Sequence, residues 1–205
     1  MEGYKINRLP ATIKEQAGIT LIEIAVVLVI MGVLVSLAAP ELSSSIKKYR
    51  VQDCVKRLAS DIKQARAKAQ ADGQRAVVVV TKDTPQDFNS DGDSEHYLIF
   101  LDKNRNELYD EGETIIVEGV CQSGITMEAG DNPLQSCPSI SNARCLEFTS
   151  LGTLNSDATG RRIQMKLGMN KVRITVVSIV GHLQIQRCEE TTSGLCDNNN
   201  NWHDF

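Results

Sequence analysis

One apolar segment near the start of the chain limits what the rest can fold into. From Ile24 to Ala39 no residue carries a charge, and extending the run back to Ile19 adds a single charge, Glu23. As a helix rising about 1.5 Å per residue, this longer run would span roughly 31 Å, the thickness of a bilayer core. A carboxylate at the centre of such a helix costs about 2.5–3.5 kcal/mol, and it marks a functional position.

The plain alternatives for this segment are a signal anchor and a cleaved secretory signal. Ala38 and Ala39 are small enough for a cleavage site, but Pro40 follows directly, and we expect it to disfavour cleavage there. The stretch AGITLIEIAVVLVIMGVLVSLAAP instead resembles the processing and helix segment of type IV pilins and type II secretion pseudopilins. Gly18, Glu23 at its fixed offset, the uncharged run and Pro40 all fit that family. Its one departure is Ile19, where phenylalanine is commoner.

The resemblance implies that the chain is a substrate of a prepilin peptidase. This enzyme would cut between Gly18 and Ile19, and the new amino group of Ile19 would be N-methylated. The leader, residues 1–18, would stay cytoplasmic and be removed. Residues 19–40 would form a single transmembrane or fibre-core helix in the bacterial inner membrane, and the rest would face the periplasm.

The resemblance also implies a role for Glu23 in assembly. Its expected partner is the amino group of Ile19 on a neighbouring subunit, because an unpaired charge in a low dielectric is strongly penalised. Other pilins or pseudopilins, held through this helix, are then the partners in the assembled fibre. The alternative is that Glu23 lies near the interface and snorkels to water.

Beyond Pro40 the pattern predicts an amphipathic helix over residues 41–72. Pro40 removes one backbone hydrogen bond and predicts a bend. The pair Asp72-Gly73 ends the helix, with Gly73 free to take the left-handed cap conformation. Apolar residues at steps of four and three form one stripe, Val51, Val55, Leu58, Ile62, Ala65 and Ala69.

Residues 73–205 carry the pattern of a β-rich periplasmic domain. Strands that follow a helix, without alternating with it, predict an α+β, pilin-like fold with the long N-terminal helix packed on an antiparallel sheet. Ser178–Gly181 predicts the turn of a closing hairpin, and residues 198–205 predict a loose tail. The expected strands are 76–81, 97–102, 113–118, 146–149, 163–167, 172–177 and 183–186.

Three stretches of this domain resemble the H-type minor pseudopilin (GspH)/FimT subfamily: YLIFLDKNRNELYDEGETII, FTSLGTLN and VRITVVSIVGHLQIQ. The resemblance covers most of residues 58–187. It implies a structural subunit near the tip of the periplasmic pseudopilus of type II protein secretion. The alternative is a FimT-like minor pilin of a type IV pilus with a role in DNA uptake.

The DNA-uptake alternative depends on a Gly-Arg-x-Arg hairpin that some FimT proteins carry. Here that place holds Gly181-His182-Leu183-Gln184, so both arginines are absent. The formal net charge of −4 also argues against a chain that coats nucleic acid. Nucleic acid is therefore not an expected partner, and the remaining basic residues are expected on solvated strand faces: Arg161, Arg162, Lys166, Lys171 and Arg173.

Enzyme signatures are absent from the sequence. It contains no HExxH, no C-x-x-C and no glycine-rich phosphate loop. Catalytic triads are dispersed along a chain, so a membrane-anchored periplasmic enzyme stays open as a third, weaker hypothesis. We expect a structural protein without a catalytic site and without a cofactor, apart from a candidate structural calcium ion.

Six cysteines follow the apolar segment, where a periplasmic location would permit disulfides. Cys188 and Cys196 are the first expected pair. Cys121, Cys137 and Cys145 bracket a loop rich in Pro, Ser and Asn, and one bridge is expected there. Cys54 is expected either to bridge the helix to the sheet or to remain a buried thiol.

Two acidic loops resemble halves of a calcium-binding loop. In the first, residues 87–95, oxygen-bearing side chains alternate and Gly92 takes the sixth position, but Leu98 replaces the acid expected at the twelfth. The second, residues 102–113, has that acid in Glu113 but Glu107 in place of the glycine. Each half-match is also typical of a solvated turn. The candidate calcium ligands of the first loop are Asp87, Asn89, Asp91, Asp93 and Glu95.

Overall fold

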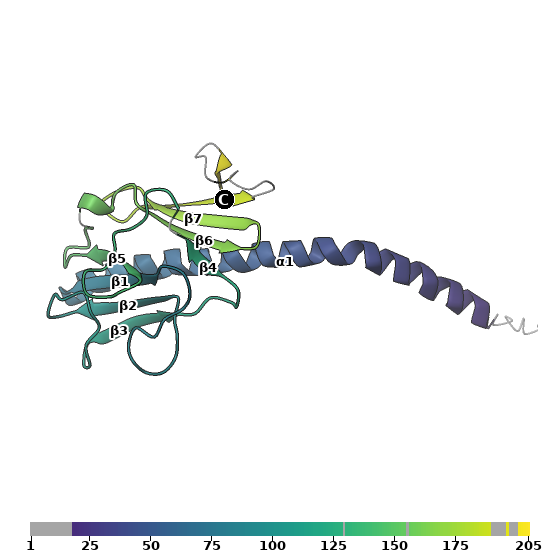
Figure 1. The fold of residues 1–205 in the computed structure, drawn as a ribbon, viewed down its shortest axis with the longest axis horizontal. Helices are drawn as coiled ribbons and strands as arrows, with labels where there is room; N and C mark the ends of the chain where they lie inside the picture. Colours follow the sequence, from purple (N-terminus) through teal and green to yellow (C-terminus); the bar gives the residue numbers. More distant parts are fainter. Residues whose placement is uncertain (1–17, 129, 155, 190–195, 197–200) are drawn as a thin grey trace, which may run out of the picture. The chain divides into compact units, whose positions relative to one another are not determined.

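A computed structural model describes residues 18–128, 130–154, 156–189, 196 and 201–205. The chain divides into two compact units, Met1–Ser43 and Ser44–Phe205. Helix α1, Leu21–Asp72, begins in the first unit and ends in the second, and it continues through Pro40 (Figure 1). The bend predicted at Pro40 stays a prediction.

The first unit consists, in its described part, of the start of α1. Its large apolar side chains from Ile22 to Leu37 are exposed, with Val29 67% and Leu37 70% accessible. No single helix of the described residues is long and apolar enough to cross a membrane. By length and composition alone, Leu21–Leu37 and Glu41–Asp72 pass that test as a bent pair.

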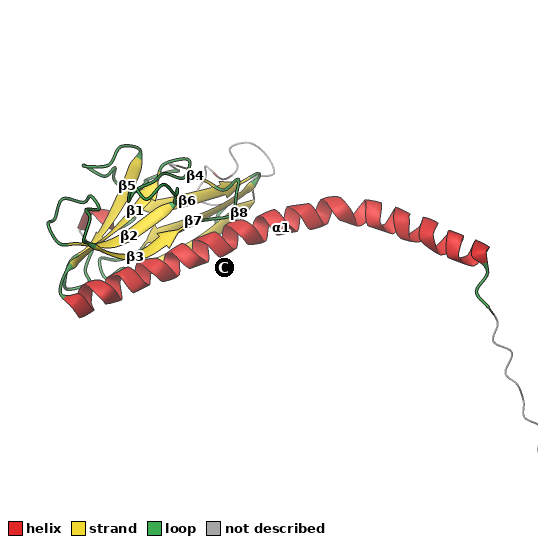
Figure 2. Cartoon of the chain, turned by 90° about the horizontal axis from the view of Figure 1, so that it is seen from below, coloured by secondary structure: helices red, strands yellow, loops and turns green. Residues whose placement is uncertain are grey.

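Within the second unit, α1 presents the predicted apolar stripe to the core. All six stripe residues are fully buried, from Val51 to Ala69. The helix ends at Asp72, and Gly73 follows with φ of +63°, the left-handed conformation predicted for its cap. Figure 2 shows this part of the helix lying along the strands.

The described part of this unit holds two antiparallel sheets (Figure 1). The first has the order β3-β2-β1-β5, with β1 Arg75–Thr81, β2 Tyr97–Asp102, β3 Thr114–Gly119 and β5 Ala143–Phe148. The second has the order β4-β6-β7-β8-β9, with β4 Thr126–Glu128, β6 Arg162–Leu167, β7 Asn170–Val176, β8 Leu183–Glu189 and β9 His203–Asp204. The short 3₁₀ helix η1, Ser156–Ala158, lies on the connection from β5 to β6.

These elements confirm the α+β, pilin-like class and all seven expected strands, with bounds that differ by up to three residues. The expectation of one sheet is wrong, because β7 pairs with β6 and β8, which in turn pair with β4 and β9. In the described part of the chain, none of these strands belongs to the sheet of β1 and β5. Strands β4 and β9 were not predicted, since two or three residues are too few to show a strand period.

Both faces of the first sheet are buried. Alternate residues of β1 point to opposite sides: Val78 packs in the main core with the α1 stripe, whereas Val77 and Val79 pack in a second apolar cluster. This second apolar cluster consists of Val77, Val79, Phe88, Leu98, Phe100, Cys137 and Ala143, with Tyr109, Ile115, Ile140 and Cys145 packed against it. Loops, not a helix, cover this face, which explains the continuous apolar runs of β1 and β2.

The prediction of a loose C-terminal tail is wrong for its described residues. Trp202 is buried beside Cys188 and Cys196, and its indole N–H donates to the carbonyl oxygen of Cys196 at 2.9 Å. The guanidinium of Arg173 lies over the Trp202 ring, 4.2 Å from its centroid. Residues 198–200 of the predicted tail lie outside the described residues.

Tyr97 joins the helix to the first sheet. Its ring lies over Gly119, its cross-strand partner on β3, and its hydroxyl donates to Asp61 of α1 at 2.7 Å. Burial and this hydrogen bond raise the pKa of Tyr97 well above its ordinary value. A Cβ atom on residue 119 would overlap ring carbons of Tyr97, so only glycine leaves room for the ring.

We therefore expect Gly119→Ala to lower the free energy of unfolding by about 1–3 kcal/mol, the usual cost of overpacking a core. Denaturant unfolding of the full chain in detergent would measure this. Thr114→Ala, an exposed change on the same strand, is the control and should stay within about 0.5 kcal/mol of wild type. Wild-type stability in Gly119→Ala would show that the ring does not depend on the glycine.

Candidate functional site

The start of α1 is capped by Thr20. The backbone N–H of Glu23 donates to Thr20 Oγ1 at 3.3 Å, and the N–H of Ile24 donates to the Thr20 carbonyl at 3.3 Å. A threonine three residues before a glutamate is the spacing of a capping box, and an acid in the first turn is favoured by the helix dipole. The helix therefore begins directly after the predicted cut. Sequence reasoning missed this role of Thr20, although the T-x-x-E spacing is visible in the sequence.

Glu23 has no ion-pair partner among the described residues, where no lysine or arginine lies within salt-bridge distance of its carboxylate. It lies in a shallow apolar hollow with Ile19, Ile24, Val27 and Leu28. Gly18 and Ile19 are exposed ahead of it. Cleavage at Gly18, methylation of Ile19 and the assembly roles of Glu23 and Pro40 stay predictions.

The described cysteines form three disulfides, which confirms that these residues pair. Cys188 bonds Cys196, the pair expected first, and Cys137 bonds Cys145 across the expected loop.

The third bond joins Cys54 of α1 to Cys121, which lies in the loop directly after β3, so Cys54 links the helix to the end of a sheet strand and is not a free thiol. The backbone N–H of Cys121 donates to Nδ1 of His96. Burial lowers the pKa of His96.

The first acidic loop, residues 87–95, brings three of its five predicted ligands together. One carboxylate oxygen from each of Asp87, Asp91 and Glu95 lies within 4.8 Å of the others. Asn89 instead donates its amide N–H to Asp91 at 2.8 Å, and Asp93 is not part of the group. Burial, with the nearby charges of Asp91 and Asp87, raises the pKa of Glu95.

In the second acidic loop, residues 102–113, the carboxylates accept N–H groups of the loop, as Asp87 and Asp91 also do in the first loop. Asp102 accepts backbone N–H groups of Arg105, Asn106 and Glu107 and pairs with Arg75 at 2.5 Å. Glu113 accepts the backbone N–H groups of Lys103 and Asp110. Asp110 accepts the amide N–H groups of Asn104 and Asn106. These bonds fit a hydrogen-bonded turn.

The basic residues of β6 and β7 are paired with acids and are not simply solvated. Lys166 and Lys171 lie 3.2 and 3.5 Å from Glu128. Lys171 and Arg173 are buried, contrary to the expectation of solvated faces. Burial, joined by the positive charge of Arg162, lowers the pKa of Arg173 to about 10.

Asp131 completes this set as the partner of two arginines. Arg162 bonds it directly, and Arg173 lies 3.6 Å away. Burial alone would raise the pKa of Asp131, but the hydrogen bond and charge of Arg162 outweigh it, so that pKa falls.

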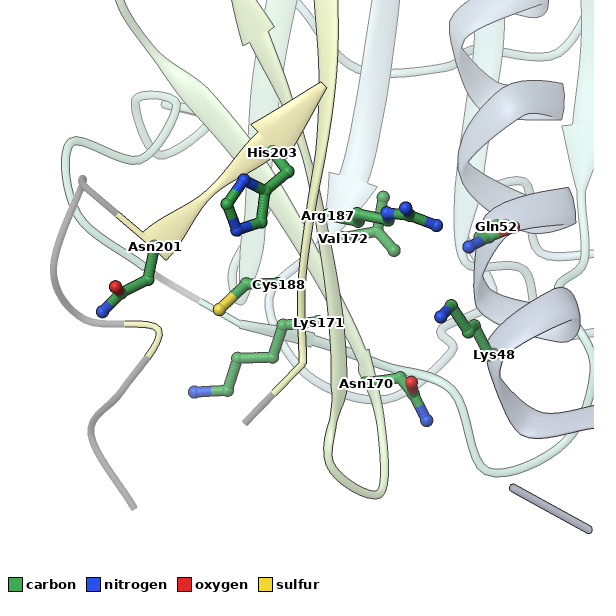
Figure 3. Close-up of a pocket in the computed structure, with 9 residues that line it drawn as sticks. All are labelled: Lys48, Gln52, Asn170, Lys171, Val172, Arg187, Cys188, Asn201 and His203. Atoms are coloured by element: carbon green, nitrogen blue, oxygen red, sulfur yellow. The ribbon is translucent and has the colours of Figure 1, made fainter. Parts of the chain in front are cut away.

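A cavity of about 310 Å³ lies between α1 and the edge of the second sheet (Figure 3). Figure 3 shows Lys48 and Gln52 reaching toward it from the helix, and Arg187 from the sheet. Its one sulfur, Cys188, is held in a disulfide, so the lining offers no thiol nucleophile. The nine lining residues are Lys48, Gln52, Asn170, Lys171, Val172, Arg187, Cys188, Asn201 and His203.

Two carboxylates, Asp102 and Glu147, pair with Arg75 and form a further titratable cluster. Glu147 lies 3.1 Å from Arg75, which also holds Asp102. Burial and a hydrogen bond with Glu107 raise the pKa of Glu147 to about 7. No motif in the sequence indicates this cluster, because it joins β1, β5 and the second acidic loop.

Two family models match the chain. The prokaryotic N-terminal methylation motif matches residues 13–39, and the type II transport protein GspH matches residues 55–180, more than half of the chain. The chain belongs to the GspH family. No curated protein and no solved structure matches it.

The two matches cover different parts of this GspH-family protein. The methylation motif contains Gly18, Ile19 and Glu23. The GspH match contains the stripe from Val55 onward, the first sheet and both acidic loops, and it ends before the Cys188–Cys196 bridge.

The raised pKa of Glu147 makes stability depend on pH. The folded state holds the proton more tightly than the unfolded chain, so this contribution is fully present below about pH 4.5 and is lost as the pH rises to about 7. Glu147→Gln lacks the titration. Relative to wild type, we expect the variant to gain about 1–3 kcal/mol of unfolding free energy between pH 4.5 and pH 8.

Denaturant unfolding at several pH values would measure this gain. Glu111→Gln is the control, because it also removes one carboxylate but at an exposed position. It should show no gain. A pH-independent difference between Glu147→Gln and wild type would contradict the prediction.

Proposed function

We propose that this GspH-family chain is a minor pseudopilin of a type II protein secretion system, a structural subunit near the tip of the periplasmic pseudopilus. One observation carries the proposal: Glu23, which has no ion-pair partner in the described residues, lies in the first turn of a helix whose apolar side chains are exposed at that end, and the helix leads into a GspH-family domain. Exposed apolar area of this extent needs lipid or neighbouring helices to cover it. The chain is then a building block and not an enzyme.

The N-terminal segment supports two successive environments. Before assembly, the exposed apolar side chains would lie in the inner membrane, with the domain Ser44–Phe205 in the periplasm. The three disulfides of this domain suit an oxidising compartment. A prepilin peptidase would remove the leader and expose the amino group of Ile19.

In the fibre, the new amino group of Ile19 on one subunit would pair with Glu23 on the next. Each charge alone is costly in an apolar helix bundle, and together they offset that cost only when the register is right. The pair would thus favour correctly placed subunits. Thr20 already satisfies the backbone N–H of Glu23, which leaves the Glu23 carboxylate for an outside partner.

A FimT-like minor pilin with DNA capture is the alternative, and the β7–β8 turn gives it no support. His182 and Gln184 stand where the arginines would be. The basic residues of β6 and β7 are already paired with Glu128 and Asp131. A DNA-binding assay on the full chain would distinguish the two hypotheses, and salt-sensitive binding would favour the alternative.

Processing provides the first test. We expect Gly18→Ala to reduce cleavage strongly, because the peptidase site needs almost no side chain before the cut. Gly18 itself is exposed and a Cβ there meets no atom within 4 Å, so the change leaves the fold intact. Mass spectrometry of the chain from membranes would show the uncut form accumulating.

Gly32→Ala, also without a contact within 4 Å, is the control and should be cut normally. A wild-type mass that begins at Met1 or at Glu41 would exclude pilin-type processing.

Glu23→Gln tests the ion pair. The change keeps size and hydrogen bonding but removes the charge, so membrane insertion and cleavage should persist. Incorporation into the fibre should fall by about tenfold or more, because the amino group of Ile19 then lacks its partner in a low dielectric. Crosslinking and co-purification with partner pseudopilins would measure it.

The control is Glu41→Gln, an exposed change on the same helix, and it should assemble as wild type does. If Glu23→Gln assembles and supports secretion at the wild-type level, the ion-pair mechanism is wrong for this subunit.

A further inference from the structure

We propose that the first acidic loop, residues 87–95, binds a calcium ion through the carboxylates of Asp87, Asp91 and Glu95. These three groups place ligand oxygens within 4.8 Å of one another. The site lies in the second unit, far along the sequence from the processing segment, and it does not depend on the proposed role in secretion.

Glu95 is the observation that distinguishes this loop from an ordinary acidic turn. The residue is 1% exposed, and one carboxylate oxygen, Oε2, accepts the backbone N–H of Phe88 at 3.3 Å. The other oxygen, Oε1, is buried and has no hydrogen-bond partner in the structure. A buried carboxylate oxygen without a partner is costly, and a bound cation would remove that cost.

The surrounding charges favour a cation in the same place. Asp87 and Asp91 add two exposed carboxylates beside Glu95. Among the described residues, no lysine or arginine forms an ion pair with any of the three. Asp87 accepts the backbone N–H groups of Ser90 and Gly92, and Asp91 accepts the amide N–H of Asn89 and the backbone N–H of Asp93. These hydrogen bonds hold the two carboxylates in place but bring no positive side chain to the three acids, and a divalent ion would offset their mutual repulsion.

The loop is held in shape before any ion binds. Gln86 and Glu95 exchange two backbone hydrogen bonds of 2.9 Å that close its base. Phe88 is buried in the second apolar cluster and fixes the loop to the sheet. Little conformational entropy is then left to lose when an ion binds.

Ligand chemistry identifies the ion as calcium. The donors are all oxygens, which hard cations prefer, and two of the three carboxylates are exposed, so water can complete a coordination shell of six to eight. Magnesium needs a nearly ideal octahedron and gives up its waters reluctantly. Because Leu98 stands where a calcium loop usually has a bidentate glutamate, we expect weak binding, with a Kd of about 0.1–1 mM.

Thermal unfolding of the purified full chain in detergent tests this proposal with calcium itself as the probe. Between EDTA and about 10 mM CaCl₂, the midpoint should rise by about 3–10 °C, as follows from the expected Kd and the size of the chain. The same concentration of MgCl₂ should give a much smaller rise. Isothermal titration calorimetry should find one calcium per chain.

Two variants and one matched control complete the experiment. Glu95→Gln and Asp91→Asn should lose most of the calcium-dependent rise, while Asp93→Asn, in the same loop but outside the carboxylate group, should keep it. In EDTA, Glu95→Gln should be at least as stable as wild type, because it removes a buried charge; this separates lost binding from lost folding.

Three results would overturn the proposal. One is the absence of a calcium-dependent rise in the wild-type chain. Another is an equal rise with magnesium, which indicates general screening of acidic groups. The third is a loss of the rise in Asp93→Asn as large as in Glu95→Gln. Since none of these measurements involves secretion or fibre assembly, each leaves the proposed function untouched.

Discussion

The domain depends on burial of one helical face. The stripe of α1 from Val51 to Ala69 is fully buried against residues from both sheets, among them Val78 of β1 and Ile174 of β7. Removing apolar side chains from water at about 25 cal/mol per Å² is the main force that holds the helix to the sheets. Among the described residues no strand of one sheet pairs with a strand of the other, so the common helix and the shared core join them. The segment 133–136 adds a backbone link, because it bridges Arg162 of β6 and Arg144 of β5.

Specific bonds fix the position of the helix along the sheets, because apolar burial is non-directional and does not fix it alone. Cys54 bonds Cys121, Asp61 accepts the hydroxyl of Tyr97, and Arg66 donates to the carbonyl of Gly152. These contacts are spread over three turns of the helix. A force applied along the helix would therefore reach the domain through a disulfide and hydrogen bonds as well as through apolar packing.

The sequence predicted those features that depend on neighbours along the chain. The stripe, the end of α1 at Gly73 and the apolar strands β1 and β2 follow from period and composition within a short window. The division into two sheets depends on which distant strands pair, and local pattern does not determine this. The burial of Trp202 depends in the same way on Cys196 and Arg173, which contact it from elsewhere in the chain. The cluster of three carboxylates was only partly predictable. The alternation of oxygen-bearing side chains indicated Asp87, Asp91 and Glu95, but it also included Asn89 and Asp93. The sequence does not show which of these oxygens the folded loop brings together.

Loops that cover an apolar sheet face lack the regular backbone hydrogen bonds of a strand or helix. Side-chain packing or disulfides must therefore hold them against the sheet. On the outer face of the first sheet, Phe88 and the Cys137–Cys145 bridge provide such anchors, and both belong to the second apolar cluster or pack against it. Phe88 lies within the first acidic loop, so whatever orders that loop also keeps the cluster covered. A cation that joins Asp87, Asp91 and Glu95 would tighten the loop on both sides of Phe88 at once. If an ion binds there as proposed, neutralising the carboxylates at the surface would also protect the apolar area beneath Phe88.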